Sequence, residues 1–204
     1  MENKFKTYVL DIETKPQADL VNICASGIKA PKTYKDEAKI SAYIEQKKLD
    51  IRKKMSVDTD YSEIICIGIK EVGGEAALYS LVEFSEFLKV HTIDGYLTCK
   101  FVTYNGKKFD FPVIIKSAIK NKIELPFKDL KEMTGKYKVS NHYDLIELNE
   151  YGNFKSLDIM LQIYLGISKK PVDFDTASEA EIKEHCLEDL INTEKLFNLF
   201  KPSL

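Results

Sequence analysis

The chain has 204 residues and a formal net charge of −2, with 44% hydrophobic and 30% charged residues. The length fits one ordinary domain, and the composition is typical of a soluble globular protein. The near-neutral charge argues against a histone-like or strongly basic nucleic-acid binder. It does not exclude a nuclease, because carboxylates that bind metal ions enter the same charge count.

The cysteines and the apolar runs indicate the compartment. Cys24, Cys66, Cys99 and Cys186 stand far apart and form none of the paired motifs of zinc or redox sites. Each has apolar neighbours, which predicts small buried side chains in a reducing compartment. The first residues form no apolar leader, and the longest apolar run, Ile64 to Ile69, is far shorter than the ~20 residues that span a bilayer. We therefore expect a soluble cytoplasmic protein that does not bind membranes.

Regular structure is expected first at Tyr8 to Thr14, an apolar strand that stops at Lys15-Pro16. Residues 17–58 are interpreted as an insertion. It contains a helix from about Asp36 to Met55, where apolar side chains keep helical spacing. The lysine-rich remainder of this helix indicates a solvated face, and a nucleic-acid contact there is the alternative.

The following elements are mainly strands. Glu63 to Glu71 is predicted to be a buried strand, and Gly73-Gly74 indicates a hairpin into another strand at Ala76 to Leu81. A short helix is expected at about Glu83 to Val90. Leu97 to Tyr104 is rich in β-branched and aromatic residues, which favours a fourth strand.

The second half is mainly helical. Helical spacing extends from Phe109 to Ile123, and residues 124–138 are expected to form a loop. A fifth strand is predicted at His142 to Leu148. Two more helices follow, from Ser156 to Leu165 and from Ser178 to about Phe200, each with serine as its cap. Strands in the first half with helices behind them predict an α/β layer fold.

The first strand ends on two carboxylates, Asp11 and Glu13. Side chains alternate along a strand, so both carboxylates point to the same face. Two acids this close repel each other, and a divalent cation between them would remove that cost. Carboxylate oxygens suit Mg²⁺ or Mn²⁺. The alternative is an edge strand whose solvent-facing side carries both acids.

A second acidic segment contains Asp110, which is expected at the start of the helix that follows the fourth strand. Asn105-Gly106 predicts the tight turn between the two elements. The alternative is that Asp110 simply caps its helix. That alternative gives no account of Phe109 beside the acid, unless Phe109 belongs to the core.

A third acidic segment lies on the final helix, where His185 and Asp189 are four residues apart. They stack along the edge of the apolar face, so an inward-leaning carboxylate would need a cation. An ordinary helical His–Asp pair is the alternative. The inward face is expected to consist of Ile182, Cys186, Leu190, Thr193, Phe197 and Phe200.

Taken together, these segments resemble the DEDD superfamily of 3′–5′ exonucleases, which has a ribonuclease H-like fold. The resemblance is greatest to the proofreading exonuclease of family-B DNA polymerases and its stand-alone relatives. Asp-Ile-Glu-Thr at 11–14 and Tyr-Asn-Gly-Lys-Lys-Phe-Asp-Phe-Pro at 104–112 match the first two exonuclease motifs. Residues 142–145, 189–193 and 31–44 are similar to further segments of those relatives.

The resemblance covers nearly the whole chain. It implies a single exonuclease domain over residues 1–204, with a five-stranded mixed sheet flanked by helices and a helical insertion after the first strand. It also implies 3′–5′ phosphodiester hydrolysis with two divalent ions, Mg²⁺ or Mn²⁺, and His185 orienting or deprotonating the attacking water. Family-B-like members have tyrosine where His185 stands, and the histidine branch has its histidine one residue earlier. The ligands implied for the two ions are Asp11, Glu13, Asp110 and Asp189.

The resemblance also suggests how substrate is held. The expected partner is nucleic acid, with single-stranded DNA favoured over RNA, and a DNA polymerase or other replication protein in trans. The alternative function is a catalytically silent nucleic-acid-binding or scaffolding domain, and a ribonuclease H-type or integrase-type endonuclease is a third reading. The expected substrate contacts are a hydrogen bond from Asn105, packing by Phe109, an apolar floor from Leu10 or Ile12, and phosphate contacts from Lys107 and Lys108.

Overall fold

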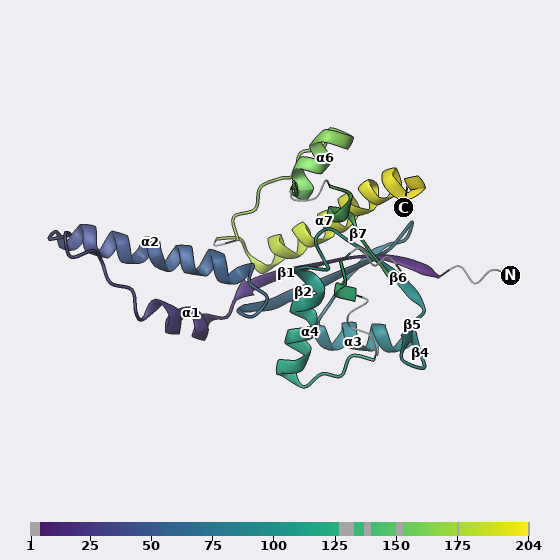
Figure 1. The fold of residues 1–204 in the computed structure, drawn as a ribbon, viewed down its shortest axis with the longest axis horizontal. Coiled ribbons are helices and arrows are strands. Elements are labelled where there is room, and N and C mark those ends of the chain that lie inside the picture. The colour runs from purple at the N-terminus through teal and green to yellow at the C-terminus, as the bar shows by residue number, and fades with distance from the viewer. Residues whose placement is uncertain (1–4, 127–132, 137–139, 150–152, 175, 204) are drawn as a thin grey trace.

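The structure is a computed structural model that describes residues 5–126, 133–136, 140–149, 153–174 and 176–203. Its centre is a sheet of five strands in the order β3-β2-β1-β6-β7 (Figure 1). β1 pairs antiparallel with β2 and parallel with β6. The sheet is therefore mixed, and the predicted α/β, ribonuclease H-like fold class is confirmed. The strands are β1 (Lys6–Pro16), β2 (Ser62–Glu71), β3 (Ala76–Tyr79), β6 (Cys99–Thr103) and β7 (His142–Asp144).

Alternation along β1 gives each face of the sheet its own core. Tyr8, Leu10 and Ile12 pack on the face covered by α3 (Leu81–Val90) and α4 (Asp110–Asn121). Val9 packs on the opposite face with α6 (Leu157–Leu165) and α7 (Glu179–Phe200). The carboxylates two and four residues after Val9 therefore lie on the α7 side. Because α7 covers this face and Val9 on it is fully buried, the alternative in which the acids lie on a solvent-facing side is wrong.

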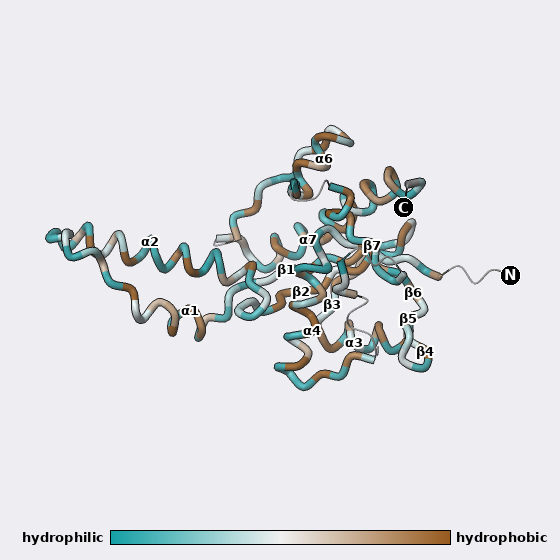
Figure 2. Tube along the Cα trace, in the orientation of Figure 1, coloured by the Kyte–Doolittle hydropathy of each residue, from teal (hydrophilic) through white to brown (hydrophobic). Residues whose placement is uncertain are grey.

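A helical arm lies between β1 and β2 and projects from the sheet (Figure 1). It consists of α1 (Ala18–Ala25) and α2 (Glu37–Ser56), and hydrophilic residues predominate along α2 (Figure 2). The Asp36 side chain caps α2 by accepting hydrogen bonds from two backbone N–H groups. The predicted helical insertion is confirmed. Helix α1 was not predicted, because eight residues show little periodicity and such a helix depends on packing, here against α2.

Three helix ends agree with the capping signals. Ser156 and Ser178 each accept a hydrogen bond from the third residue of the helix they precede. Gly166 ends α6 with a φ of 64°, a left-handed conformation in which a side chain is strained. Helix α7 ends at Phe200, as expected, and a short 3₁₀ turn at Lys201–Ser203 follows it.

Several strand boundaries differ from the predictions. β1 continues through Lys15 and Pro16, because Pro16 is the last residue of the strand, where its missing N–H matters least. The predicted strand at 97–104 is divided. Tyr96–Leu97 (β5) forms a small hairpin with Thr92–Ile93 (β4), and the sheet strand β6 begins at Cys99.

The fifth strand is also shorter than predicted. β7 ends at Asp144 and is followed by a 3₁₀ helix, η1, at Leu145–Leu148. The Asp144 side chain accepts a hydrogen bond from the Ile146 N–H, which turns the backbone out of the sheet. One cysteine differs too: Cys24 on α1 is exposed instead of buried. Within the described ranges, every helix is too short or too polar to cross a lipid bilayer.

Candidate functional site

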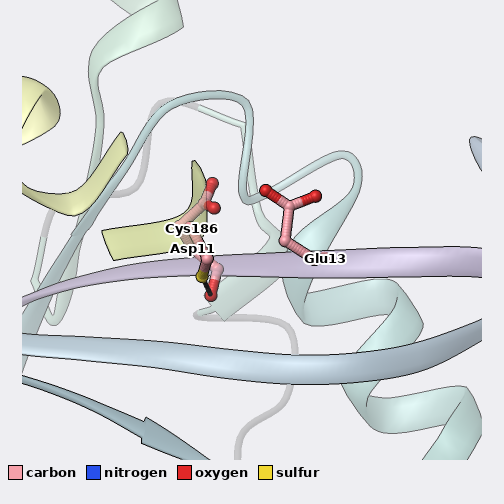
Figure 3. Close-up of side chains that lie close together, drawn as sticks. All are labelled: Asp11, Glu13 and Cys186. Atoms are coloured by element: carbon pink, nitrogen blue, oxygen red, sulfur yellow. Dashed lines mark hydrogen bonds between the residues drawn. The ribbon is translucent and has the colours of Figure 1, made fainter. Parts of the chain in front are cut away.

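The two acids of β1 point to the same side of the strand, next to a thiol from α7 (Figure 3). Asp11, Glu13 and Cys186 each offer a ligand atom, and these atoms lie within 4.8 Å of one another. The Cys186 thiol also donates a hydrogen bond to the Asp11 carbonyl oxygen, 3.9 Å away. Cys186 was predicted as part of the inward face of its helix, but its position beside the acids was not.

Helix α7 approaches the acids closely because Gly68 of β2 has no side chain. Gly68 pairs with Asp11 across the two strands. A Cβ atom at Gly68 would lie 2.7 Å from Cys186 Sγ and 2.8 Å from Leu190 Cδ1, closer than real Cβ contacts allow. The absence of that atom therefore lets the helix pack directly over the acidic part of β1.

Asp110 reaches the same strand from the other side. It is the first residue of α4 and is 4% exposed. Its Oδ1 accepts a hydrogen bond from the backbone N–H of Ile12, which stands between the two acids of β1, at 3.2 Å. The residue before it, Phe109, occupies the cap position without a side-chain cap. Asp110 therefore anchors α4 to β1, and the helix-capping alternative is wrong.

Asp189 on α7 is the fourth acid and is paired with a lysine. Its Oδ2 accepts a hydrogen bond from the Lys169 ammonium group at 2.5 Å, while its Oδ1 is buried without a hydrogen-bond partner. Lys169 lies in the segment between α6 and α7. Nothing in the sequence pattern indicated its role, because a lysine in a loop has no periodic signal.

The electrostatic state of the site reflects burial and mutual repulsion. Desolvation, followed by the charges of Asp110, Glu13 and Asp189, raises the pKa of Asp11 well above its ordinary value. Desolvation and then Asp189 raise the pKa of Glu13 to about 8. The Lys169 ammonium opposes both shifts. The structure therefore places Asp11 and Glu13 within ligand distance of each other, and Asp110 and Asp189 near enough to act on them through their charges, although neither belongs to the group of ligand atoms within 4.8 Å.

His185 lies at the edge of this cluster. Its Nε2 is 3.8 Å from Asp189 Oδ2, and its Nδ1 is buried without a hydrogen-bond partner. The ring packs edge-on against Phe174, with the centroids 5.6 Å apart. Burial lowers the pKa of His185, more than the Asp189 charge raises it. The imidazole is therefore neutral near pH 7 and has a lone pair to accept a proton.

The turn before α4 is held by an acid that sequence reasoning did not assign to the site. Asp144 at the end of β7 accepts hydrogen bonds from the N–H groups of Asn105, at 2.6 Å, and Lys107, at 2.9 Å. Asn105 has a φ of 71°, as the predicted Asn-Gly turn requires. A Cβ atom at Gly106 would lie within 2.5 Å of the Thr103 side chain. The resemblance of residues 142–145 to known relatives was the only signal for Asp144.

A buried hydrogen-bond chain supports this turn. The Gly106 N–H donates to Thr103 Oγ1, which is 2.7 Å from His142 Nε2. His142 Nδ1 lies 2.7 Å from the Met133 carbonyl oxygen. A carbonyl only accepts, so Nδ1 donates and Nε2 accepts from the threonine hydroxyl. Burial lowers the pKa of His142 to about 3, so this tautomer persists at neutral pH.

A groove of about 650 Å³ opens beside Glu13. Its apolar lining comes from Ile12, Phe109 and Phe174, among other residues. Two cations from the last turns of α2, Arg52 and Lys53, complete it. The groove therefore joins the acid cluster to the base of the helical arm.

The predicted substrate residues divide among three environments. Ile12 and Phe109 line the groove. Asn105 and Lys108 line a separate hollow of about 490 Å³ on the other side of the turn. Leu10 is 1% exposed and lies in the core, so it does not form the apolar floor that was predicted.

Lys107 is not the exposed lysine that the sequence suggested. It is 6% exposed, and its ammonium group forms an ion pair with Glu147 at 2.6 Å. A buried ammonium group needs such a partner, and the ion pair turns the side chain away from the solvent. Lys107 also lines the hollow that Asn105 and Lys108 share, and its predicted phosphate contact would require the ammonium group to leave Glu147.

The donor set of the cluster fits divalent metal ions. Carboxylate oxygens are the ligands that Mg²⁺ and Mn²⁺ prefer. The raised pKa values of Asp11 and Glu13 show that the charged forms of these carboxylates are disfavoured where they stand, and Asp189 Oδ1 is buried without a hydrogen-bond partner, so a bound cation would stabilise the site. The Cys186 thiol is the one soft donor within the ligand group of described residues.

The sheet order and the flanking helices define an α/β protein of the ribonuclease H-like class. Among solved structures, the chain is similar to the family B DNA polymerase from the hyperthermophilic archaeon Pyrobaculum calidifontis, with a TM-score of 0.59 and 15% sequence identity. The match covers 97% of this chain but only 25% of the polymerase chain. At this identity the likeness shows the fold alone. No family model and no curated protein matches the chain.

Proposed function

We propose that this chain is a metal-dependent 3′–5′ exonuclease that removes nucleotides from the 3′ end of single-stranded DNA. The proposal rests on the carboxylates of β1, α4 and α7, because the charges of Asp110 and Asp189 add to desolvation in raising the pKa values of Asp11 and Glu13. An acid cluster of this kind is costly to fold unless cations bind it. The motif resemblance supplies the reaction, and the likeness to a polymerase supports the fold on which it would occur.

In this proposal Asp11, Glu13, Asp110 and Asp189 hold two Mg²⁺ or Mn²⁺ ions. When bound, such ions activate the attacking water and neutralise charge on the phosphodiester. Asp189 Oδ1, which has no hydrogen-bond partner, would offer a ligand atom to an ion, while the Lys169 ammonium group on Oδ2 would compete with the ions for the charge of the same carboxylate. The Ile12 N–H keeps Asp110 in a fixed orientation before and after loading.

His185 is the proposed proton acceptor. Its burial keeps the imidazole neutral, and its Nε2 lies next to the carboxylate of Asp189. A base with a pKa below neutrality is already deprotonated at pH 7, so it can take a proton from water without prior ionisation. Phe174 fixes the plane of the ring by its edge-on contact.

The terminal nucleotide is proposed to contact Ile12 and Phe109, which line the groove beside Glu13. Asn105 acts indirectly, because its carbonyl oxygen accepts the Phe109 N–H at 3.0 Å and so positions that ring. The chain spans 25% of the polymerase that it resembles. A DNA polymerase or other replication protein as partner is also part of the proposal, and it rests on the resemblance of the motifs alone.

A digestion assay tests the function. Single-stranded DNA labelled at the 5′ end should become shorter one nucleotide at a time in Mn²⁺, whereas a 3′ label should appear at once as mononucleotide. Asp11→Asn should abolish both the shortening of the 5′-labelled strand and the release of the 3′ label. Glu75→Gln changes an exposed acid near the β2–β3 hairpin and should leave both unchanged. Cleavage of a closed circle would instead indicate an endonuclease, and the same assay on RNA establishes the substrate class.

One observation favours a second candidate, a nucleic-acid-binding domain without activity. Lys169 already neutralises Asp189, and the tightest group of ligand atoms contains Cys186 in place of Asp110 and Asp189. Such a domain would bind single-stranded DNA and leave it intact in both Mg²⁺ and Mn²⁺. Binding without any digestion by the wild-type protein would replace the exonuclease proposal with this one.

A further inference from the structure

The groove beside Glu13 has two chemically different parts. Its apolar lining includes Ile12, Phe109 and Phe174, and at α2 it is lined by the exposed cations Arg52 and Lys53. Lys15, Asp173 and Glu179 are its other charged lining residues besides Glu13. A cationic surface that shares a groove with an acid cluster has no role in the four-carboxylate site itself. It matches the distribution of charge along a nucleic-acid strand whose end lies at the acids and whose preceding phosphates lie farther back.

The position of these cations is set by the strand that carries the acids. The Thr14 hydroxyl, one residue after Glu13, donates a hydrogen bond to the Ser56 carbonyl oxygen at the end of α2, at 2.6 Å. Met55, the neighbouring residue, is 5% exposed and anchors the same turn in the core. The last turns of α2 are therefore held against β1, so Arg52 keeps a constant place relative to the acids.

The basic residues of α2 have an ordinary explanation that accounts for only part of them. Cations near a helix C-terminus stabilise the helix dipole, which fits Lys53 in the last turn. Lys47 and Lys48 form ion pairs within the helix, with Asp50 and Glu45. Neither explanation applies to Arg52, which precedes the last turn and lines the groove.

Aromatic side chains line the same groove as the cations and Glu13. Phe174 is 44% exposed and lines the groove together with Phe109. Proteins that bind single strands combine a positively charged track for the backbone with aromatic faces on which bases stack. An exposed phenylalanine that is already held by His185 on one edge offers such a face.

We propose that Arg52 and Lys53 bind the phosphates that precede the terminal nucleotide of a single DNA strand, while Phe174 stacks on one of its bases. The identity of the ligand rests on the proposed function. The helical arm then has a defined task. Its base forms the upstream binding site of the groove, which makes affinity depend on strand length.

Binding measurements separate this site from catalysis. In an Asp110→Asn background with Mn²⁺, fluorescence anisotropy of labelled oligothymidylates of two and eight nucleotides reports affinity without digestion. Adding Arg52→Gln and Lys53→Gln should lower the affinity for the octamer about tenfold and leave the affinity for the dinucleotide nearly unchanged. The slope of log K against log salt should fall by about 1.4 in magnitude, the value for two phosphate contacts on a single strand.

The matched control changes two lysines of the same helix, the exposed Lys47 and the half-buried Lys48, to glutamine, and neither lines the groove. This control removes two positive charges, as the Arg52→Gln, Lys53→Gln variant does. Because its lysines lie outside the groove, it should change the affinity for the octamer less than twofold. Equal effects of the two double variants would show a general charge effect and overturn the proposal. An octamer that binds no better than the dinucleotide would also overturn it.

Neutral methylphosphonate linkages locate the contacts. In the same background, an octamer whose second and third linkages from the 3′ end are methylphosphonates should bind the protein with Arg52 and Lys53 about tenfold more weakly than the unmodified octamer. The affinity of the Arg52→Gln, Lys53→Gln variant should hardly change with this replacement. If both proteins lose affinity equally, the cations do not contact these phosphates and the inference fails. Phe174→Leu should lower the affinity for the octamer about fivefold or more. The slope of log K against log salt should stay unchanged, because stacking on a base releases no counterions.

Digestion by proteins without the Asp110 change distinguishes the two proposals. If wild type digests the octamer, Arg52→Gln with Lys53→Gln should lower kcat/KM about tenfold through KM. Digestion that is identical in the two proteins would overturn the upstream site and leave the exonuclease proposal standing. If wild type digests nothing but the binding results hold, the exonuclease proposal fails and the upstream site stands.

Discussion

Replacing Asp110 by asparagine should stabilise the metal-free protein while abolishing its proposed activity. Asp110 is 4% exposed, and its one hydrogen bond to β1 uses an oxygen that accepts the Ile12 N–H. The carbonyl oxygen of asparagine can accept the same bond. The substitution therefore removes a buried acid without removing the contact that joins α4 to β1.

The size of the effect follows from the pKa of the carboxyl group. Desolvation, followed by the charge of Asp144, raises the pKa of Asp110 from its ordinary 3.8 to about 8. At pH 7 folding must then protonate a group that is ionised in the unfolded chain, at a cost of up to about 4 kcal/mol. Relaxation around the acid reduces this, so we expect Asp110→Asn to gain about 1–3 kcal/mol.

The sign of the pH dependence is a sharper test than the magnitude. Because the folded pKa is raised, the acid costs nothing below about pH 4 and costs most above about pH 8. The stability gain of Asp110→Asn should therefore be near zero at pH 4 and grow towards pH 8. Urea unfolding in EDTA at both pH values measures it. A gain that is equal at the two pH values, or a variant that is less stable than wild type at pH 7.5, would refute the reasoning.

Three further predictions concern α7 and its partners. His185→Ala should lower kcat by about 10²–10⁴ with little change in Mn²⁺ affinity, and equal loss of metal binding would show that the imidazole is structural. Lys169→Met should tighten Mn²⁺ binding measured by calorimetry without DNA, because the ammonium group no longer competes for Asp189. Weaker binding would contradict this. Gly68→Ala should cost about 1–3 kcal/mol in thermal unfolding, and Cys186→Ala in the same chain should restore part of it.

The acids could be predicted from sequence because their positions follow from local rules. Alternation along β1 places Asp11 and Glu13 on one face, and the apolar spacing of α7 places Asp189 on its inward edge. The Asn-Gly pair at 105–106 predicts a tight turn, and that local signal places Asp110 at the start of the next helix. Bringing these segments together required the resemblance, since periodicity says nothing about which elements are neighbours.

The roles of several residues depend on tertiary contacts and could not be predicted from the sequence. Lys169 acts on Asp189 from a loop 20 positions away. Lys107 looked like a solvated turn residue, yet Glu147 and the fold bury it. Phe174 and Arg52 carry no motif, and their importance follows from the groove that they share. In each case the partner comes from a distant part of the chain, so local propensity and spacing give no signal.

The ammonium group of Lys169 has a consequence for how the protein matures. Its ion pair with Asp189 places a positive charge among the acids of the folded chain without any bound ion. Under the proposed function, metal binding would then replace one cation by others at a site that is already partly neutralised. The Lys169 ammonium group would in this way stabilise the folded acid site when metal ions are scarce.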